Sequence, residues 1–510
     1  MVIRAFNFRK YKAPLIVLLI IAISITGYFA FFKRSSTQLY SKQYKKIAGQ
    51  CTHYDIYADF NPENKSINAV QTVRYKNNTN TTLNELYFYL YPNAFKNEDM
   101  TPFPGEEFSR AYPNGFDPGY IEINYIKAGE EELDFKLNDI YLQVPLPSKG
   151  LKQGREISLE ISFKVQIPNC LGRFGYGEKT FNICNWYPIL AVYDENGWNL
   201  DPYYAIGDPF YSESSIYQVT IEAPKDFIIA STGEQVEVKD KDDTKKIWTI
   251  ETGLVRDFAW TASSDYKIAS TTVDGIKIYS YYFHEGGGKD ALKSAAESIR
   301  FYNRYFGKYP YENYSVAAAD FYIGGMEYPN LVLIDRTLYG GSFLEYIVVH
   351  ETAHQWWYGL VGSNQVKEAW LDEGLTEYST IMFLENKYGK QGKQAYDDIV
   401  KSRYHFFELS NPLDFRVLRA LNEFEGWKDY DALVYARGAM VFGEIREEVG
   451  DKTFQKVMSR YLEEYIYRNA TTEDLIRLWE KETNNTIDRC FFNKMLNIMP
   501  DDEKENISAA

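Results

Sequence analysis

Two histidines with a glutamate beside the first form the most specific chemical pattern in the sequence, the run His350-Glu351-Thr352-Ala353-His354. On a helix, His350 and His354 are one turn apart and project from the same face, so both imidazoles can bind one zinc ion. Glu351 can then act as a base toward a water molecule on the metal. The alternative is that the histidines pack or cap in an ordinary helix. Since the chain has only five histidines, the pattern favours a metal site.

A third metal ligand is predicted in the run that begins at Trp370. Glu373 follows His354 after 18 intervening residues and lies near the start of a second helix. A short loop between the two helices would bring its carboxylate to the metal. Two histidines and one glutamate leave a fourth position for water, which is the arrangement of a catalytic zinc ion. Asp372 and Glu377 are predicted to orient the ligands from outside, and the alternative for each is a solvated carboxylate.

The runs around these residues resemble the zinc aminopeptidases related to aminopeptidase N, the gluzincins of peptidase family M1. The resemblance covers residues 215–495 well and the preceding part loosely. It is carried by residues 350–362 and 370–374, by Gly-Gly-Met-Glu-Tyr-Pro-Asn at 324–330, and by Val-Tyr-Ala-Arg-Gly-Ala at 434–439. Two positions depart from the family pattern: Tyr328 stands where Asn is usual, and Arg437 where Lys is commoner.

The resemblance implies one zinc ion per chain and the release of N-terminal residues from peptides that have a free N-terminus. It implies that Tyr435 donates a hydrogen bond to the developing oxyanion and that Glu327 binds the α-amine. The remaining residues that it places along the bound substrate are Gly324, Gly325 and Met326. The family has a second polar anchor for the amine in its β-domain, for which Glu178 and Asn182 are weak candidates.

Three further expectations concern the class of protein. A thermolysin-type endopeptidase shares the zinc helix, but Glu327 in its motif favours the aminopeptidase. A non-catalytic binding relative is disfavoured because all the zinc and catalytic residues are present. The resemblance also describes a short form without the long helical C-terminal domain of large family members, so that either the site is more open or another chain covers it. The preferred N-terminal residue, the physiological substrate and the oligomeric state are not predicted.

An apolar run at residues 13–32 contains no charge and has the length of a helix that spans a bilayer. It ends in Phe31-Phe32 rather than in a small-residue cleavage site, so a single-pass anchor is favoured over a cleaved signal peptide or a buried core helix. Residues 1–12 form a basic flank and residues 33–50 a basic stalk. Basic residues on both sides leave the orientation undecided. We expect the catalytic part outside the cytoplasm, because the span is at the extreme N-terminus.

The remaining chain divides into two domains and a tail. Residues 51–265 alternate between apolar and polar side chains in short runs, which predicts an all-β saddle or sandwich. Residues 266–497 are predicted to form a thermolysin-like α/β domain that is mostly helical, and residues 498–510 a disordered tail. The ranges expected to be strands are 53–60, 66–75, 85–90, 121–126, 156–165, 217–221, 227–230, 246–250, 315–319 and 330–334; helices are expected over 290–306 and 343–360.

The overall composition is that of a globular protein, with 45% hydrophobic and 25% charged residues. Its net charge of −15 argues against a nucleic-acid binder, which would carry a basic face. Residues 1–50 hold nine basic residues and no acid, so residues 51–510 carry a balance of −24. Four cysteines are too few for a disulfide scaffold. Cys170 and Cys184 are close enough in sequence to be bridged, and free buried thiols are the alternative.

Overall fold

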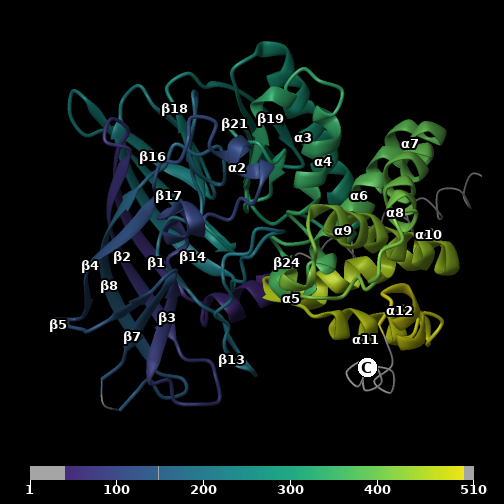
Figure 1. Cartoon of the computed structure of the whole chain (residues 1–510), viewed down its shortest axis with the longest axis horizontal. Coiled ribbons are helices and arrows are strands. Elements are labelled where there is room, and N and C mark those ends of the chain that lie inside the picture. The colour runs from purple at the N-terminus through teal and green to yellow at the C-terminus, as the bar shows by residue number, and fades with distance from the viewer. Residues whose placement is uncertain (1–40, 148, 499–510) are drawn as a thin grey trace, which may run out of the picture.

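A β-rich half and a mostly helical half lie side by side in the computed structural model, which describes residues 41–147 and 149–498 (Figure 1). This confirms the predicted order of a large β-rich region followed by a helical catalytic region. The predicted span at 13–32 and nearly all of the predicted tail are outside the described residues. Among the residues that are described, no helix is both long enough and apolar enough to cross a bilayer.

The β-rich half is organised around one large twisted sheet. Nearly all its neighbouring strands are antiparallel, and β1 and β14 form its parallel pair. In β1 every second side chain is buried, as the alternation of the sequence predicts. The strands in spatial order are β16 (Glu234–Asp240), β17 (Lys245–Val255), β14 (Ser215–Pro224), β1 (His53–Asn61), β2 (Ser66–Lys76), β8 (Glu156–Gln166), β4 (Tyr120–Ala128) and β5 (Glu131–Glu132).

Smaller sheets pack around this one and close the β-rich core, to which aromatic side chains contribute heavily. One has the order β15 (Ile228–Ser231), β18 (Trp260–Ser263), β10 (Phe181–Ile183) and β9 (Phe174–Tyr176). Another has the order β11 (Ile189–Leu190), β3 (Glu85–Tyr89), β7 (Tyr141–Pro145) and β6 (Lys136–Asn138). A hairpin joins β12 (Tyr193–Asp194) to β13 (Gly197–Trp198), and one short helix, α2 (Glu106–Ala111), lies between β3 and β4.

The helical half begins with a five-stranded mixed sheet that carries one edge of the site. Its order is β19 (Lys267–Val273), β20 (Ile276–Tyr282), β21 (Asn313–Ala319), β23 (Leu331–Asp335) and β22 (Gly325–Met326). The helices that follow or flank it are α3 (Glu285–Tyr305), α4 (Leu344–Ala353), α5 (Gln365–Glu368), α6 (Trp370–Tyr388), α7 (Lys390–Ala395), α8 (Ser402–Glu408), α9 (Trp427–Tyr430), α10 (Gly438–Tyr465), α11 (Thr472–Thr483) and α12 (Arg489–Met495). Two π-helical segments, Tyr396–Lys401 and Asp431–Arg437, precede α8 and α10.

The helix predicted over residues 343–360 is wrong in its second half, because α4 ends at Ala353. The chain then turns, and short strand β24 (Val361–Gly362) pairs with β25 (Arg468–Asn469). Trp356 and Trp357 are adjacent and both fully buried. Their indole nitrogens bind groups on different elements, Trp356 to the Gly307 carbonyl and Trp357 to the Ser379 hydroxyl.

The first described residues of the chain pack onto the helical half. Residues 41–48 are helical. The Gln43 side chain donates to the carbonyl of Glu463, and the Tyr44 ring contacts the Tyr467 ring edge-on at 5.8 Å. All four cysteines are free, and Cys170 and Cys184 are buried thiols that are not bonded to each other.

Candidate active site

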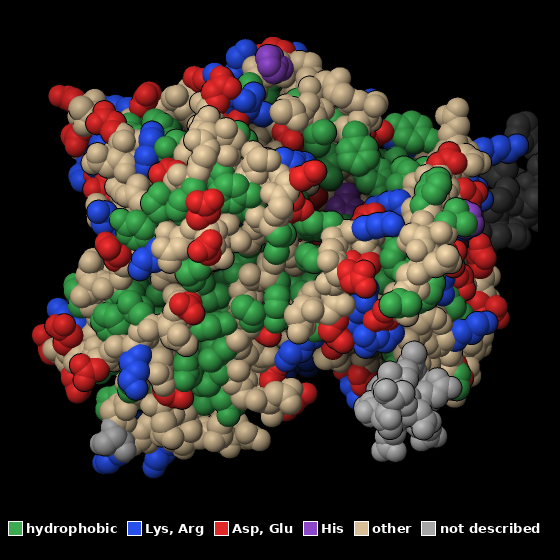
Figure 2. All heavy atoms as spheres, viewed as in Figure 1, with side chains coloured by type: hydrophobic (Ala, Val, Ile, Leu, Met, Phe, Trp, Pro, Cys, Tyr) green, Lys and Arg blue, Asp and Glu red, His purple; other side chains and the backbone are tan. Residues whose placement is uncertain are grey.

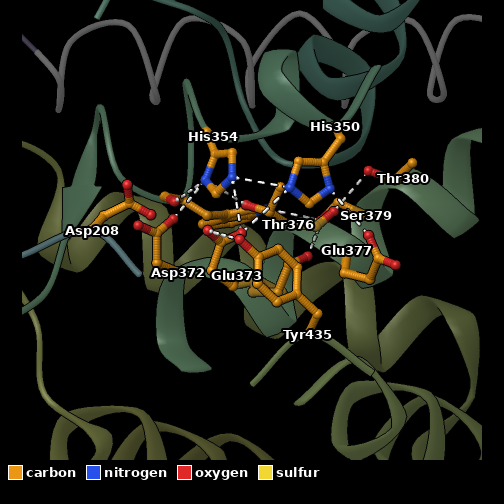
Figure 3. Close-up of polar contacts among 12 residues, drawn as sticks. Asp208, His350, His354, Asp372, Glu373, Thr376, Glu377, Ser379, Thr380 and Tyr435 are labelled. Atoms are coloured by element: carbon orange, nitrogen blue, oxygen red, sulfur yellow. Dashed lines mark hydrogen bonds and ion pairs between the residues drawn. The ribbon is translucent and has the colours of Figure 1, made fainter. Parts of the chain in front are cut away.

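Helices α4 and α6 bring the three predicted metal ligands together at the junction of the two halves. His350 Nε2 lies 3.2 Å from His354 Nε2, and Glu373 Oε2 lies 3.4 Å and 3.2 Å from these two atoms (Figure 3). Two imidazoles one helical turn apart face the first turn of α6, as the spacing predicts. All three side chains are buried, and Figure 2 shows a histidine, in purple, in a hollow between the halves.

This donor set fits a zinc ion. Bonds of about 2.0–2.2 Å to a tetrahedral zinc require ligand atoms about 3.3–3.5 Å apart, close to the three separations found. Glu373 Oε2 has no hydrogen-bond donor although it is buried, so a cation is the partner it lacks. Burial alone would raise the pKa of Glu373, but His354 and His350 hold it below its ordinary value. One carboxylate and two imidazoles thus present three ligand atoms at the spacing that a zinc ion requires.

The outer nitrogens of both histidines are bound to carboxylates on α6, those of Asp372 and Glu377. His354 Nδ1 donates to Asp372 Oδ1 at 2.6 Å, and His350 Nδ1 donates to Glu377 Oε2 at 3.1 Å. The other oxygen of Asp372 accepts from Gln365 Nε2 at 2.6 Å. Because each Nδ1 donates outward, each Nε2 directs its lone pair at the shared position.

Glu351 lies against the edge strand β22, where Gly325 leaves room for it. A Cβ built on Gly325 would be 2.2 Å from Glu351 Oε1, so a side chain larger than hydrogen at this position would displace the carboxylate. Glu351 Oε2 is buried and has no hydrogen-bond partner. Burial raises the pKa of Glu351 to about 7, although His350 and His354 lower it. The carboxylate is thus placed beside the metal position with one oxygen free for another molecule.

Glu327 reaches the same space from the segment that the sequence singled out. One ligand atom each of Glu327, Glu351 and His354 lies within 4.8 Å of the others. Glu327 is only 3% exposed, and its Oε1 has no hydrogen-bond partner. Burial and the neighbouring Asp208 raise the pKa of Glu327 well above its ordinary value. A buried carboxylate without a donor is costly, so Glu327 lacks a cationic or hydrogen-bonding partner.

Of the neighbouring motif residues, Gly324 precedes β22, Met326 belongs to it, and Tyr328 binds the β-rich half. Gly324 has a φ of +100°, a conformation that favours glycine. The Met326 sulfur accepts from Arg173 Nε at 2.9 Å. Tyr328 is buried, and its hydroxyl donates to Asn185 Oδ1 in the β-rich half at 2.9 Å. The departure from the family's Asn therefore contributes a bond between the halves.

Tyr435 enters the site from the π-helical segment Asp431–Arg437. Its hydroxyl donates to Glu373 Oε1 at 2.6 Å, and its ring lies nearly parallel to that of His350, with centroids 6.0 Å apart. Burial and the Glu373 carboxylate raise the pKa of Tyr435 well above its ordinary value, so the phenol keeps its proton. Next to it, Gly438 meets Gly374 of α6 with almost no space between their backbones.

Sequence reasoning missed Asp208 and Arg173, which extend from the β-rich half to the site. Asp208 is buried, lies among the site residues in Figure 3, and forms an ion pair with Arg173 Nη2. The pKa of Asp208 is raised by burial and lowered by Arg173. No motif or spacing marks either residue, because each belongs to a loop whose contacts with the site form only in the folded chain.

The two weak candidates for a β-domain anchor are outside the site. Glu178 is exposed and pairs with Arg336 Nη2 at 2.9 Å. Asn182 is buried, and its amide donates to the carbonyls of Gly172 and Asp320. Asp208 is the acid from the β-rich half that lies with the metal ligands (Figure 3).

Comparison with known proteins agrees with this geometry. The family model described as "Peptidase family M1 domain" matches residues 290–494. Aminopeptidase M1-A of Oryza sativa subsp. japonica is 27% identical over 286 residues, which are 52% of this chain and 32% of that protein. Aminopeptidase 2 of Candida albicans is 27% identical over 418 residues, 70% of this chain and 43% of that protein. The chain thus spans less than half the length of these relatives.

A solved structure shares the fold over most of the chain. The M1 zinc metallopeptidase from Deinococcus radiodurans superposes with a TM-score of 0.63 and 17% sequence identity, covering 88% of this chain and 95% of that one. At this identity the likeness concerns the fold alone.

Proposed function

We propose, from the premise that residues 290–494 form a peptidase family M1 domain, that this chain is a zinc aminopeptidase. It would hydrolyse the first peptide bond of substrates with a free N-terminus. His350, His354 and Glu373 would hold one zinc ion per chain, and the separations of their inner atoms support this assignment. When bound, zinc would polarise the substrate carbonyl and lower the pKa of a water molecule.

The residues of the chain would then move the protons. Glu351, with its free Oε2 beside the metal position, would accept the proton of the attacking water as the new C–O bond forms. The Tyr435 hydroxyl would donate a hydrogen bond to the carbonyl oxygen as it gains negative charge. When the C–N bond breaks, Glu351 would pass the proton to the departing amine. One water molecule is consumed, and an amino acid and a shortened peptide are released.

One observation carries the aminopeptidase assignment: the unpartnered, buried Glu327 carboxylate lies next to Glu351 and His354. The α-ammonium of a substrate supplies the positive charge and the donors that this carboxylate lacks. Asp208, another buried acid at the site, would add to the negative field around the ammonium. A blocked N-terminus would leave Glu327 without a partner, which is a large penalty in a buried site.

The test of this assignment is a Glu327→Gln substitution, measured with an aminoacyl chromogenic substrate in the zinc-loaded protein. We expect KM to rise about tenfold or more, because an ion pair with a buried charge is lost. Glu178→Gln is the matched control, since Glu178 pairs with Arg336 outside the site, and its KM should stay unchanged. Equal KM values for the two variants would refute the amine-anchoring role. Efficient cleavage inside a blocked peptide would instead indicate a thermolysin-type endopeptidase. A zinc-loaded chain without any peptidase activity would indicate a non-catalytic relative.

We further propose that residues 13–32 anchor the chain in the cell membrane with the catalytic part outside the cytoplasm. The support is the uncharged apolar run itself, which is long enough to span a bilayer. Protease added to intact cells should digest the catalytic part, and an alkaline wash should leave the chain in the membrane pellet. Recovery of the full-length chain in the soluble fraction would contradict the anchor, and protection from the protease would contradict the orientation.

A further inference from the structure

Arg403 connects two parts of the candidate site, the part that holds His350 and the part that holds Tyr435. It contacts neither the metal position nor the substrate space. It lies at the start of α8, and its Nη2 forms an ion pair with Glu377 Oε1 on α6. Its Nη1 donates to Asp431 Oδ1 at 2.7 Å. Its Nε donates to the carbonyl of Ile399 at 2.9 Å, which fixes the plane of the guanidinium. One side chain thus binds two carboxylates on separate elements.

The contact with Glu377 leads to a metal ligand. Glu377 is 1% exposed, and its Oε2 accepts from His350 Nδ1. Its Oε1 accepts from the Tyr346 hydroxyl at 2.5 Å as well as from Arg403. A fully buried carboxylate without donors is strongly disfavoured, and Arg403 supplies donors to Glu377 on the side away from His350.

The contact with Asp431 leads to the tyrosine. Asp431 is the first residue of the π-helical segment that carries Tyr435. Tyr435 in turn binds Glu373, the third metal ligand. Contacts thus lead from His350 through Glu377 and Arg403 to Asp431. The π-helical segment continues from Asp431 to Tyr435, which binds Glu373.

We propose that Arg403 is a positioning residue that fixes His350 and Tyr435 relative to each other by binding Glu377 and Asp431 at once. This inference rests on the proposed function, because it gives His350 and Tyr435 their roles as metal ligand and oxyanion donor. Only a fork of donors can serve two carboxylates and a carbonyl in fixed directions. A lysine at this position would carry the charge but bind only one carboxylate well.

A second arginine, Arg446 of α10, provides a matched control because it also binds a carboxylate of α6. Arg446 Nη1 pairs with Glu385 of α6 at 2.6 Å, and its Nε pairs with Asp451 of α10 at 2.7 Å. Glu385 is two turns beyond Glu377, so this pair joins the same helix to a neighbour without reaching the metal ligands. The Arg446 side chain is 17% exposed and that of Arg403 is 29% exposed, so both are largely buried.

The experiment compares Arg403→Ala, Arg403→Lys and Arg446→Ala in the full chain. The zinc dissociation constant is measured by competition with a chelator, and kcat and KM with an aminoacyl chromogenic substrate. We expect Arg403→Ala to weaken zinc binding about 10- to 100-fold, as loss of an outer partner does, and to lower kcat more than it changes KM. Arg403→Lys should recover most of the zinc affinity but not kcat. Arg446→Ala should leave zinc affinity and kcat within about twofold of the wild type.

Zinc affinity and kcat in Arg403→Ala that match those in Arg446→Ala would overturn the proposal. If Arg403→Ala fails to fold, Arg403→Lys decides: full kcat with lysine would also overturn it. The zinc measurement does not depend on substrate. A wild-type chain that binds zinc but releases no N-terminal residue would refute the proposed function, while the zinc affinities of the variants would still test Arg403.

Discussion

The hydroxyl of Tyr435 donates a 2.6 Å hydrogen bond to Glu373 Oε1, so the proposed oxyanion donor rests on a metal ligand. The phenol is therefore separated from the metal position only by the Glu373 carboxylate. The same phenol would have to exchange this acceptor for the carbonyl oxygen of a bound peptide. The distance between the phenol and the metal position therefore depends on both α6, which carries Glu373, and the π-helical segment, which carries Tyr435.

Replacement of Tyr435 by Phe should lower kcat by about 10²-fold or more and leave KM nearly unchanged, because the lost bond forms mainly in the transition state. Steady-state kinetics with an aminoacyl substrate would measure both constants. Tyr141→Phe is the control, since Tyr141 binds the Leu200 carbonyl in the β-rich half. An unchanged kcat in Tyr435→Phe would show that the tyrosine has another role.

Replacement of Glu351 by Gln should remove a base while preserving the shape of the site. We expect kcat to fall by about 10²- to 10⁴-fold while zinc remains bound at one ion per chain. Metal analysis of the dialysed variant and turnover assays would be compared with Glu345→Gln, which changes a carboxylate of the same helix that pairs with Lys387. Near-full turnover by Glu351→Gln would exclude it as the base.

Replacement of Gly374 by Ala should disturb the packing of α6 and with it Glu373. The added Cβ would lie 2.8 Å from Gly438 Cα, a backbone atom that cannot move without its helix. We expect a loss of about 1–3 kcal/mol of unfolding free energy, measured by denaturant titration, and weaker zinc binding. Gly286→Ala, at an exposed position with nothing within 4 Å, should not destabilise the fold. A Gly374→Ala variant as stable as Gly286→Ala would contradict this close approach.

The buried carboxyl group of Asp257 should make the unfolding free energy depend on pH. It is buried, its Oδ1 accepts from Tyr187 at 2.8 Å, and its Oδ2 accepts from Asn185 at 2.6 Å. Burial raises the pKa of Asp257 to about 6 from its ordinary 3.8, although the Tyr187 bond lowers it. Between these values the unfolded chain releases a proton that the folded chain retains. This group therefore makes the unfolding free energy fall as pH rises from about 4 to 6, and adds no slope outside that window.

Asp257→Asn should remove that fall, so the variant gains stability relative to the wild type across the window, by at most about 3 kcal/mol. Denaturant titrations at several pH values would measure the difference. Asp226→Asn, at an exposed position, should keep the wild-type slope. Parallel curves for wild type and Asp257→Asn would contradict the buried titration.

The features that could be predicted are those that depend on residues close to one another in the sequence. The spacing of His350 and His354 determines their common face on any helix, and alternation marked strands such as β1 and β2 nearly to the residue. Glu373 was predicted from its place near the start of a second helix, although β24 and α5 lie in the connection that was expected to be a short loop.

The rest depends on contacts between distant segments. Helix α4 ends at Ala353, and Trp356 and Trp357 then bind groups on different elements, which periodicity alone does not reveal. Asp208 reaches the site from a loop of the β-rich half. Arg403 can be recognised as a site residue only from its ion pairs with Glu377 and Asp431 in the folded chain. Such pairs have no fixed spacing in sequence, so no motif could identify them.

The most direct test of the central claim compares two peptides of identical sequence, one with a free N-terminus and one N-acetylated, with the zinc-loaded protein and with the same protein treated with a chelator. Release of the first residue would be followed by mass spectrometry. The account predicts stepwise release from the free peptide only, and none after zinc removal. Cleavage of the acetylated peptide at the same rate, or unchanged release without zinc, would contradict it.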